Sequence, residues 1–368
     1  MMKLKIGLLY GGKSAEHDVS LLTARAVSQA IDFNKYEVFP IFITKDGEWR
    51  KGAALTGPVD TVEKLQFGEE NGKANDISSF LPSVSSSKQV SDAEASSLDV
   101  IFPLLHGPNG EDGTVQGLLE VLNLPYVGNG VLASAAGMDK VVMKQLFTQA
   151  GLKQVPYVYF IRSEWESNRK ELLKKIESEL KWPLFVKPAN LRSSVGITKA
   201  NNVEDLISAI NLAFKYDRKV LIEQGVVARE IEMSVLGNDH PKCSVAGEVL
   251  PTKDFYDYSA KYIDGTTNYA IPANVSPKLL SKLQDAAIRA FKILDCSGLV
   301  RADFFVTDTE EVLINEVNTM PGFTPISMYP KLWMASGLSY SELIEELIRL
   351  AMERYEEKQQ LEHSQDGE

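Results

Sequence analysis

Residues 187–197, KPANLRSSVGI, decide how this sequence is interpreted. They follow the apolar run 184–186, so the sequence predicts a buried strand that leads into a loop with Lys187, two serines and Gly196. Backbone N–H groups and hydroxyls in such a loop commonly bind phosphate oxygens. The stretch therefore predicts a loop over a phosphate chain, with Arg192 where such a loop most needs a glycine.

The composition is that of a globular protein with a small-molecule partner. The chain has 368 residues, which predicts two or three domains rather than one core. Lysine and arginine number 39 and aspartate and glutamate 50, giving a formal net charge of −11. No basic block interrupts this acidic sequence, which argues against a nucleic-acid-binding protein.

The two cysteines, Cys243 and Cys296, indicate a reducing compartment. They lie far apart and neither belongs to a CxxC motif, so they predict two buried thiols and no zinc site. No apolar run is long enough to cross a bilayer. Residues 4–10 run directly into two glycines, which favours a first strand over a signal peptide. We expect a cytoplasmic protein with no membrane partner.

Strands and helices alternate in the first part of the chain, which predicts a parallel sheet with helices on its faces. The serine-rich stretch 83–97 has almost nothing to bury and predicts an exposed loop. The expected elements are strands at 4–10, 37–44 and 98–105 and helices at 19–31 and 114–123.

The second part of the chain predicts an α+β arrangement. A helix is expected from near Met138 to Gly151, and another is expected to be opened by Ser163 with Glu166 in a capping box. The polar residues after 354 predict a fraying helix end and a disordered tail. The other expected elements are strands at 155–161, 183–188, 219–224, 230–237, 244–250, 299–306 and 311–318 and helices at 203–215 and 278–293.

Three oxygen-bearing side chains are predicted to share one face of a hairpin. Glu316 and Asn318 are two residues apart on one strand, and Asp303 lies on the preceding strand. Carboxylate and amide oxygens are ligands that Mg²⁺ takes, and carboxylates in apolar strands need a cation or donors. Arg301 shares the face of Asp303, where it could stabilise a developing oxyanion, form an ion pair with Glu316, or do both.

Several other polar residues lie at the ends of apolar elements. Lys140 and Lys187 would either bind phosphate or extend to solvent. Glu223 ends an apolar strand, where it could accept hydrogen bonds from an adenine or a ribose or be a surface acid. The sequence alone leaves both choices open.

The segment GGKSAEHDVS follows the first expected strand, but its spacing is not GxGxxG, which argues against a dinucleotide-binding hydride-transfer enzyme. Glu16 lies at a helix N-terminus, where it could also bind a substrate ammonium. His17 is expected to be structural or exposed. His106 ends the third strand at the same sheet edge as Glu16, which makes it a candidate ligand residue. The segment 255–262, FYDYSAKY, predicts a loop that closes over a site.

Taken together, these motifs resemble the D-alanine–D-alanine ligases of the ATP-grasp fold. They occur in the family's order over nearly the whole chain: GGKSAEHDVS, HGPNGEDG, MDK, FVKP, SSVG, YDYSAKY, RADFF and NEVNTMPGFTPIS. The resemblance implies an N-terminal Rossmann-like parallel α/β domain followed by a two-domain ATP-grasp. The implied divisions are 1–130, a central domain at 131–218, a C-terminal domain at 219–360 with a lid loop at 252–268, and a disordered tail at 361–368.

The resemblance implies that ATP phosphorylates the carboxylate of one D-alanine and that the amine of a second attacks the acyl phosphate. Phosphate then leaves, giving D-alanyl-D-alanine for peptidoglycan. It also implies two Mg²⁺ ions, which Mn²⁺ can replace, and a homodimer. The implied residues are Glu16, Ser193, Tyr262, Arg301 and Gly322 for catalysis; Lys140, Lys187, Ser193, Ser194, Glu223, Gln224, Val226, Glu230 and Lys261 for ATP; Glu16, His106, Tyr262, Arg301, Ser327 and Met328 for the D-alanines; and Asp303, Glu316 and Asn318 for metal.

The segment YDYSAKY indicates which second substrate the family member would use. Relatives that make D-alanyl-D-lactate carry a different loop in this place, so Tyr262 favours an amine as the second substrate, with D-lactate or D-serine as alternatives.

Arg192 departs from the family's sequence. The family has glycine at this position, and arginine is strained at positive φ. We expect Arg192 either to point outward or toward a phosphate, or to hold the loop open. Folding and ATP binding should survive with reduced turnover; the extreme alternative is an ATP-binding protein with impaired turnover.

Overall fold

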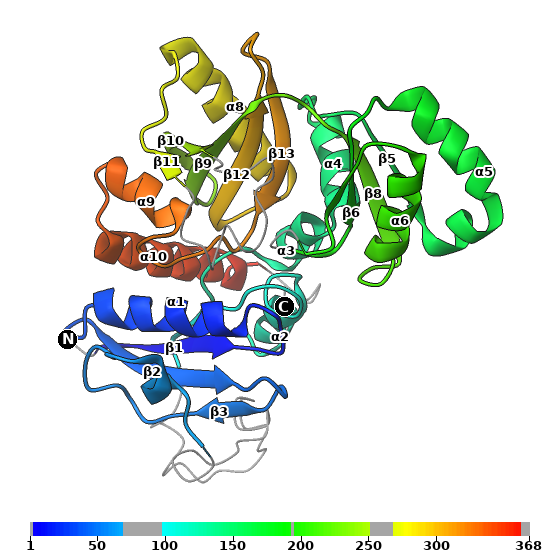
Figure 1. Cartoon of the computed structure of the whole chain (residues 1–368). Helices are drawn as coiled ribbons and strands as arrows, with labels where there is room; N and C mark the ends of the chain where they lie inside the picture. The colour runs from blue at the N-terminus through cyan, green and yellow to red at the C-terminus, as the bar shows by residue number, and fades with distance from the viewer. Residues whose placement is uncertain (1–2, 69–97, 193–194, 251–267, 362–368) are drawn as a thin grey trace, which may run out of the picture.

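The structure is a computed structural model that describes residues 3–68, 98–192, 195–250 and 268–361. Its strands form three sheets, each covered by helices, and successive parts of the chain build successive sheets (Figure 1). This arrangement confirms the expected combination of α/β and α+β architecture. The predicted serine-rich loop at 83–97 lies outside the described residues, as does almost all of the predicted 252–268 lid.

The N-terminal sheet has the strand order β3-β2-β1-β4. Strands β1 (Leu4–Gly11), β2 (Tyr36–Ile43) and β4 (Val100–Pro103) are parallel, and the short β3 (Trp49–Lys51) runs antiparallel to β2. Alternate residues of β1 point to opposite faces. One face packs against α1 (His17–Ala30) and α10 (Tyr340–Gln359), and the other packs against α2 (Thr114–Val121).

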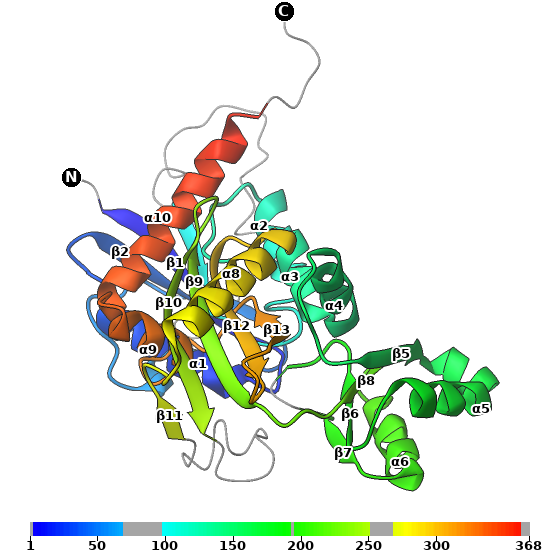
Figure 2. The ribbon, with the colours of Figure 1, turned by 90° about the horizontal axis from the view of Figure 1, so that it is seen from above.

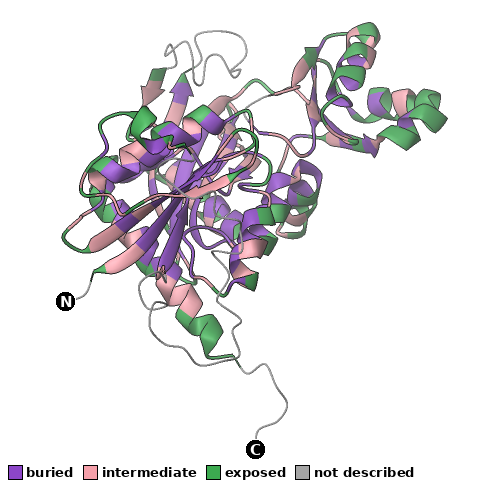
Figure 3. Ribbon diagram, turned by 90° about the horizontal axis from the view of Figure 1, so that it is seen from below, coloured by how far each residue is buried: buried purple, intermediate pink, exposed green. Residues whose placement is uncertain are grey.

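A smaller antiparallel sheet has the order β5-β8-β6-β7, formed by Tyr157–Ile161, Lys219–Gln224, Leu184–Pro188 and Thr198–Ala200. Helices α5 (Arg162–Glu179) and α6 (Val203–Ala213) pack on it around one apolar core. This unit lies to one side of the rest of the molecule (Figure 2). The buried residues of helix α5 are Trp165 and Ile176, and most of its other residues are exposed. Figure 3 shows exposed residues on the outward sides of the helices and buried residues in the sheets.

The third sheet has the order β11-β10-β9-β12-β13, formed by Asn268–Ala270, Lys242–Leu250, Arg229–Gly237, Gly298–Val306 and Val312–Asn318. Helices α3 (Val131–Met138), α4 (Lys140–Gln149) and α8 (Pro277–Ile293) share a core with one face. Helix α9 (Met328–Ala335) and α10 cover the other. Helix α10 therefore lies between the third sheet and the N-terminal sheet (Figure 1).

Local capping explains where the structure departs from the predicted elements. The helix expected from near Met138 to Gly151 is α4, which begins at Lys140 because the Asp139 carboxylate accepts from the N–H groups of Val141 (3.0 Å) and Val142 (3.1 Å). The capping box expected at Ser163 is wrong. Glu164 accepts from the Ile161 N–H at 2.8 Å and starts α5 one residue before Ser163.

Several short elements were not predicted. They include β3 and a 3₁₀ helix at Val62–Leu65, both within the polar stretch between β2 and β4, and also α3, β7, β11 and α9. Cys296 is buried as expected, whereas Cys243 is only partly buried, and both are free thiols. Across the described ranges, no helix has the length and apolar character needed to cross a membrane.

Candidate active site

The predicted metal ligands meet on the β12–β13 hairpin. Asp303 lies opposite Glu316 and Arg301 lies opposite Asn318, so the three predicted ligands share one face, as the two-residue spacing predicted. The Asn318 amide donates to Asp303 Oδ2 at 2.9 Å. In the part of the chain that the structure describes, no three acidic, histidine or cysteine side chains gather at a point suited to a metal. The hairpin instead offers two carboxylates and one amide, a hard-oxygen set that fits Mg²⁺.

Arg301 holds Asp303 through both carboxylate oxygens. Its Nε and Nη2 donate to Asp303 Oδ1 and Oδ2, each at 2.7 Å, and Nε also lies 3.0 Å from a Glu232 oxygen. Burial lowers the pKa of Arg301, but Asp303 and Glu232 outweigh this effect and raise it above its ordinary value. The main contacts of Arg301 are therefore those to Asp303 and Glu232, and the charge of Glu316 adds to the same rise in its pKa.

Arg192 points into the molecule, toward the same hairpin. Its Nη1 donates to Asn318 Oδ1 at 3.1 Å, and its Nη2 donates to the backbone oxygens of Gly137 at 2.7 Å and Val317 at 3.3 Å. Only 7% of the residue is exposed, so the expectation of an outward side chain is wrong. The expected strain is also absent. Among the described non-glycine residues, positive φ occurs at positions 109, 123, 295 and 310.

Two lysines share the carboxylate of Glu223. Lys144 Nζ lies 2.5 Å from Glu223 Oε1, and Lys187 pairs with Oε2. The side chains of Lys144 and Glu223 are only 2% and 3% exposed, so Glu223 is not a surface acid. Burial raises the pKa of Glu223, but the two lysines outweigh it and bring it to about 2. We call these three residues the lysine–glutamate cluster.

Lys140 is buried, which removes the alternative that it extends to solvent. Its Nζ donates to the backbone oxygen of Leu191, and its backbone N–H donates to Ala189 at 3.0 Å. Burial lowers the pKa of Lys140 to about 8; Glu316 opposes this effect, while Arg192 adds to it. Lys140 thus connects two parts of the site. It is hydrogen-bonded to residues 189–191, which precede the predicted phosphate loop, and it is close enough to the β12–β13 hairpin for Glu316 to affect its pKa.

Glu16 and His106 lie at the carboxyl edge of the N-terminal sheet, as predicted. Glu16 is the residue that precedes α1, and both side chains are buried. Burial lowers the pKa of His106, while the charge of Glu16 opposes that effect. His17 is structural, since its Nδ1 is 2.8 Å from the Gly12 backbone oxygen.

Glu111 lies beside this edge and was not singled out from the sequence. It is 4% exposed and accepts from the Gly107 N–H at 2.9 Å. Burial raises its pKa to about 7; Arg192 opposes this and Glu16 reinforces it. Glu111 therefore connects the N-terminal edge with the hairpin through Arg192, whose Nε is 3.9 Å from its carboxylate.

The remaining predicted residues lie on the segments that lead into these clusters. Gln224 Oε1 accepts from the Lys181 N–H at 2.9 Å, and Val226, two residues further along the chain, is exposed. Glu230 lies two residues before Glu232 on β9. Gly322 follows the hairpin, Ser327 Oγ is 2.8 Å from Thr324 Oγ1, and Met328 begins α9. Ser193, Ser194, Lys261 and Tyr262 lie outside the described residues.

The clusters belong to one electrostatic neighbourhood built from all three sheets. The pKa of Lys140 is shifted, after burial, by Glu316, Arg192, Lys187 and Glu223. The pKa of Glu111 is shifted in turn by both Glu16 and Glu316. Lys187 from the small sheet, Lys140 from α4, Glu316 from the hairpin and Glu16 at the N-terminal edge therefore converge. Such a site can bind polyphosphate and metal beside a small zwitterion.

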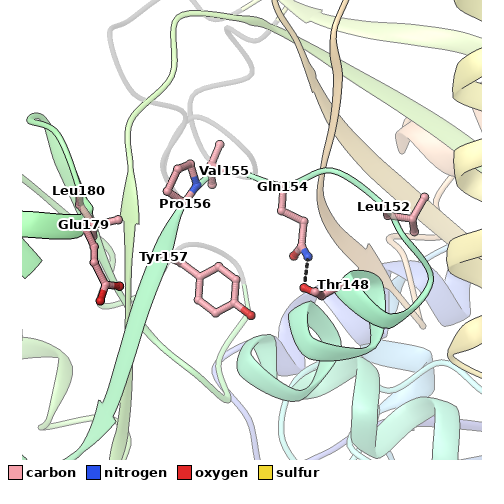
Figure 4. A pocket seen from close by; sticks show the side chains of 8 residues that line it. All are labelled: Thr148, Leu152, Gln154, Val155, Pro156, Tyr157, Glu179 and Leu180. Carbon is pink, nitrogen blue, oxygen red and sulfur yellow. Dashed lines mark hydrogen bonds between the residues drawn. The ribbon is translucent and has the colours of Figure 1, made fainter. Parts of the chain in front are cut away.

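A cavity of about 330 Å³ lies beside the lysine–glutamate cluster but is lined by other residues (Figure 4). It opens between the end of α4 and the start of β5, where Gln154 donates to Thr148 Oγ1 at 3.0 Å. Tyr157 points into it, and the Lys144 ammonium lies 5.4 Å from the centre of that ring. No predicted site residue lines this cavity, so its size alone does not identify a function.

Sequence reasoning missed Lys144, Glu111 and Glu232. Lys144 carried a detectable signal, because it lies one helical turn after Lys140 and both therefore share a face of α4. Glu232 also carried one, because it alternates with Glu230 on a strand and shares its face. Glu111 lies in a loop, where no periodicity marks it.

Comparison with known proteins identifies the family. Models described as "D-ala D-ala ligase N-terminus" and "D-ala D-ala ligase C-terminus" match residues 5–129 and 146–349. The chain is 58% identical over 366 residues to a D-alanine--D-alanine ligase of Bacillus licheniformis, covering 99% of this chain and 100% of that protein. It is also 58% identical over 360 residues to the enzyme of that name from Geobacillus thermodenitrificans, covering 98% of each.

Solved structures agree with this result. The D-alanine-D-alanine ligase from Coxiella burnetii has a TM-score of 0.79 and 35% identity, covering 98% of this chain and 97% of that one. The VanG D-Ala:D-Ser ligase from Enterococcus faecalis has the same TM-score and identity, covering 95% and 100%. The three sheets described above are thus an ATP-grasp architecture with its preceding domain, and this chain belongs to the D-alanine–D-alanine ligase family.

Proposed function

We propose that this protein joins two D-alanines into D-alanyl-D-alanine at the expense of ATP, for peptidoglycan synthesis. The observation that carries the proposal is that two groups of charges lie close together. One group is Lys140 and Lys187 with Glu316, and the other is Glu16 with Glu111. Phosphate binding needs the first set of charges, and a substrate ammonium needs the second. A buried neighbourhood that holds both is suited to moving a phosphoryl group onto the carboxylate of an amino acid.

In the proposed reaction, Lys140 and Lys187 hold ATP phosphates together with Ser193, Ser194 and Lys261. Glu223, Gln224 and Val226 line the adenine pocket and Glu230 contacts the ribose. Glu16 binds the ammonium of the first D-alanine with His106 nearby, and Ser193 and Tyr262 orient Glu16. The second D-alanine lies beside Ser327 and Met328, so that its amine attacks the acyl phosphate. Arg301 and the N–H of Gly322 stabilise the tetrahedral oxyanion.

The oxygens of Asp303, Glu316 and Asn318 would hold two Mg²⁺ ions, or Mn²⁺ in their place. Bound there, the ions supply positive charge that neutralises the phosphates of ATP. The donor chemistry of the hairpin supports this assignment. Arg301 donates hydrogen bonds to both oxygens of Asp303. We therefore expect these hydrogen bonds to lengthen when metal binds to Asp303.

We also propose that the chain divides into functional units at 1–130, 131–218 and 219–360, with ATP between the second and third. The separate cores of the small and third sheets support two units after the N-terminal one, but not these exact boundaries. Residues 133–152 contribute to the core of the third sheet, and Val220 and Ile222 contribute to the core of the small sheet. A homodimer and a cytoplasmic location complete the proposal. Light scattering on the purified protein tests the dimer.

The test is release of ADP and phosphate from Mg-ATP with and without D-alanine, with the product identified by mass spectrometry. We expect release that depends on D-alanine and yields the dipeptide. ATP turnover that ignores D-alanine, or absence of a dipeptide in the presence of ADP release, would overturn the proposal. Comparing the protein with Arg192→Gly also tests whether Arg192 reduces turnover; equal turnover would refute that expectation.

The similarity to a D-Ala:D-Ser ligase makes D-serine a specific second candidate as the attacking substrate. D-alanine, D-serine and D-lactate should therefore be compared in the same assay at equal concentrations. We expect D-alanine to be the preferred acceptor and D-lactate to react least. A product mixture dominated by D-alanyl-D-serine would change the assignment within the same reaction class.

A further inference from the structure

The side chain of Arg192 is surrounded by groups of negative charge or partial negative charge. Besides its hydrogen bonds to Asn318 Oδ1 and two backbone oxygens, its Nη1 is 3.8 Å from Glu316 Oε2 and its Nε is 3.9 Å from Glu111 Oε1. One of the backbone oxygens belongs to Gly137 in the last turn of α3, the negative end of that helix dipole. These surroundings are those of a cation-binding site.

Two of these surrounding groups, Glu316 and Asn318, are the oxygens proposed above to hold metal. A Mg²⁺ ion binds its ligand oxygens at about 2.0–2.1 Å. The guanidinium lies directly against Asn318 Oδ1, at 3.1 Å, so an ion approaching that oxygen from the same side would overlap it. An ion that approached from another side would still meet the repulsion of a positive charge in a buried setting.

The contacts of Arg192 are good but incomplete. Its Nε is buried and has no hydrogen-bond partner among the described residues, and its two carboxylate contacts are longer than hydrogen bonds. A buried guanidinium with an unsatisfied donor has lost hydration that its contacts do not fully replace. A divalent ion that brings more charge to the same oxygens can therefore displace it.

We propose that the guanidinium of Arg192 acts as a tethered cation that competes with divalent metal for Glu316 and Asn318, so that this side chain lowers the affinity of the site for metal. The inference rests on the metal site of the proposed function. In the ligand-free protein, Arg192 neutralises part of the charge of the acidic groups around it. Metal must move the guanidinium before it can bind, and the affinity for metal is lower than the oxygens alone would give.

The experiment is a titration of Mn²⁺ without nucleotide, in which the electron paramagnetic resonance signal of free Mn²⁺ gives the bound fraction. Arg192→Gly should bind Mn²⁺ about tenfold more tightly than the unsubstituted protein, since a competing charged hydrogen-bonding group is gone. Arg192→Lys should lie between them, because it keeps the charge but loses the planar fork that reaches several acceptors at once. Arg289→Gln, which removes an exposed arginine of α8, should leave the affinity unchanged and controls for net charge.

Two further measurements separate the possible outcomes. Adding Glu316→Gln to Arg192→Gly should remove the gained affinity, which places the new binding at the hairpin. Circular dichroism and thermal melting check that each variant is folded, and Arg192→Gln serves where the glycine variant is not. Equal or weaker Mn²⁺ binding by folded Arg192 variants would overturn the inference and leave the metal site standing. Absence of binding in every protein would overturn both, while dipeptide synthesis still tests the ligase itself.

Discussion

Replacing Glu223 by glutamine removes the carboxylate that Lys144 and Lys187 share. The Lys144–Glu223 pair is almost fully buried, so water screens it little. Lowering the pKa of Glu223 from 4.5 to about 2 corresponds to a contribution of about 3 kcal/mol to the free energy of unfolding at pH 7. Breaking a buried ion pair by removing one partner typically costs about 3–5 kcal/mol, which agrees with this value.

Urea unfolding at pH 7, followed by tryptophan fluorescence, measures the loss. We expect Glu223→Gln to lower the free energy of unfolding by about 3 kcal/mol. Glu311→Gln is the matched control, because Glu311 pairs with Lys153 at 2.7 Å but both side chains are largely exposed. That variant should lose less than about 1 kcal/mol.

The pH dependence gives a second, independent check. Because the folded-state pKa of Glu223 is lowered, its contribution is fully present above pH 4.5 and is lost as the pH falls toward 2. The difference between the two proteins should therefore shrink below pH 4.5. A loss at pH 7 no larger than that of Glu311→Gln, or a difference that does not depend on pH in this window, would refute the reasoning.

Three further predictions concern other parts of the site and the fold. Asp303→Asn removes a metal-binding charge and releases Arg301, so the rate of ADP release with D-alanine should fall at least about 100-fold at saturating ATP. Glu16→Gln should raise the KM of the first D-alanine about tenfold or more while changing the KM of ATP little, because it weakens an ammonium contact. Arg354→Met removes the buried donor of hydrogen bonds to the backbone oxygens of Gly128 and Tyr126 and to the hydroxyl of Ser297, and should lower the free energy of unfolding by about 2–3 kcal/mol in urea.

For each of these three predictions, a specific result would contradict the reasoning. Asp303→Asn with near-normal turnover would remove that residue from the metal site. A change in the KM of ATP as large as that of D-alanine would show that Glu16 acts on the whole site. For Arg354, the exposed Arg349 on the same helix is the control, and Arg349→Met should cost less than about 1 kcal/mol. Equal losses from the two variants would contradict the role given to the buried hydrogen bonds.

The sequence predicted those features that depend on local periodicity or on an ordered set of motifs. The shared face of Glu316 and Asn318 followed from alternation along one strand, and the facing of Asp303 followed from the expected hairpin, which the structure confirms. Strand β8 was predicted residue for residue. Helix α3 was missed because its small residues, VLASAAGM, give it no amphipathic pattern. In the structure it packs against α4 and β13 and places Ala133 and Ala136 in the core of the third sheet.

The position of Arg192 could not be predicted in the same way. Its hydrogen bond to Asn318 joins residues 126 positions apart, and a side chain of that length reaches many possible acceptors. The choice depends on where α3, β13 and the Glu111 loop meet in space. Lys144 illustrates the same limit, because nothing in its own helix shows that Glu223 lies opposite it.

Helix α10 has a consequence for how the protein folds as it is synthesised. The apolar face of β1, with Ile6, Leu8 and Tyr10, shares one core with Leu343 and Leu347 of α10, and Lys35 and Glu345 pair across 310 positions of sequence. A ribosome therefore releases the first sheet long before the helix that covers it exists. Until then the sheet exposes apolar surface, so we expect the nascent N-terminal half to depend on chaperones and to complete its folding only after residues 340–359 emerge.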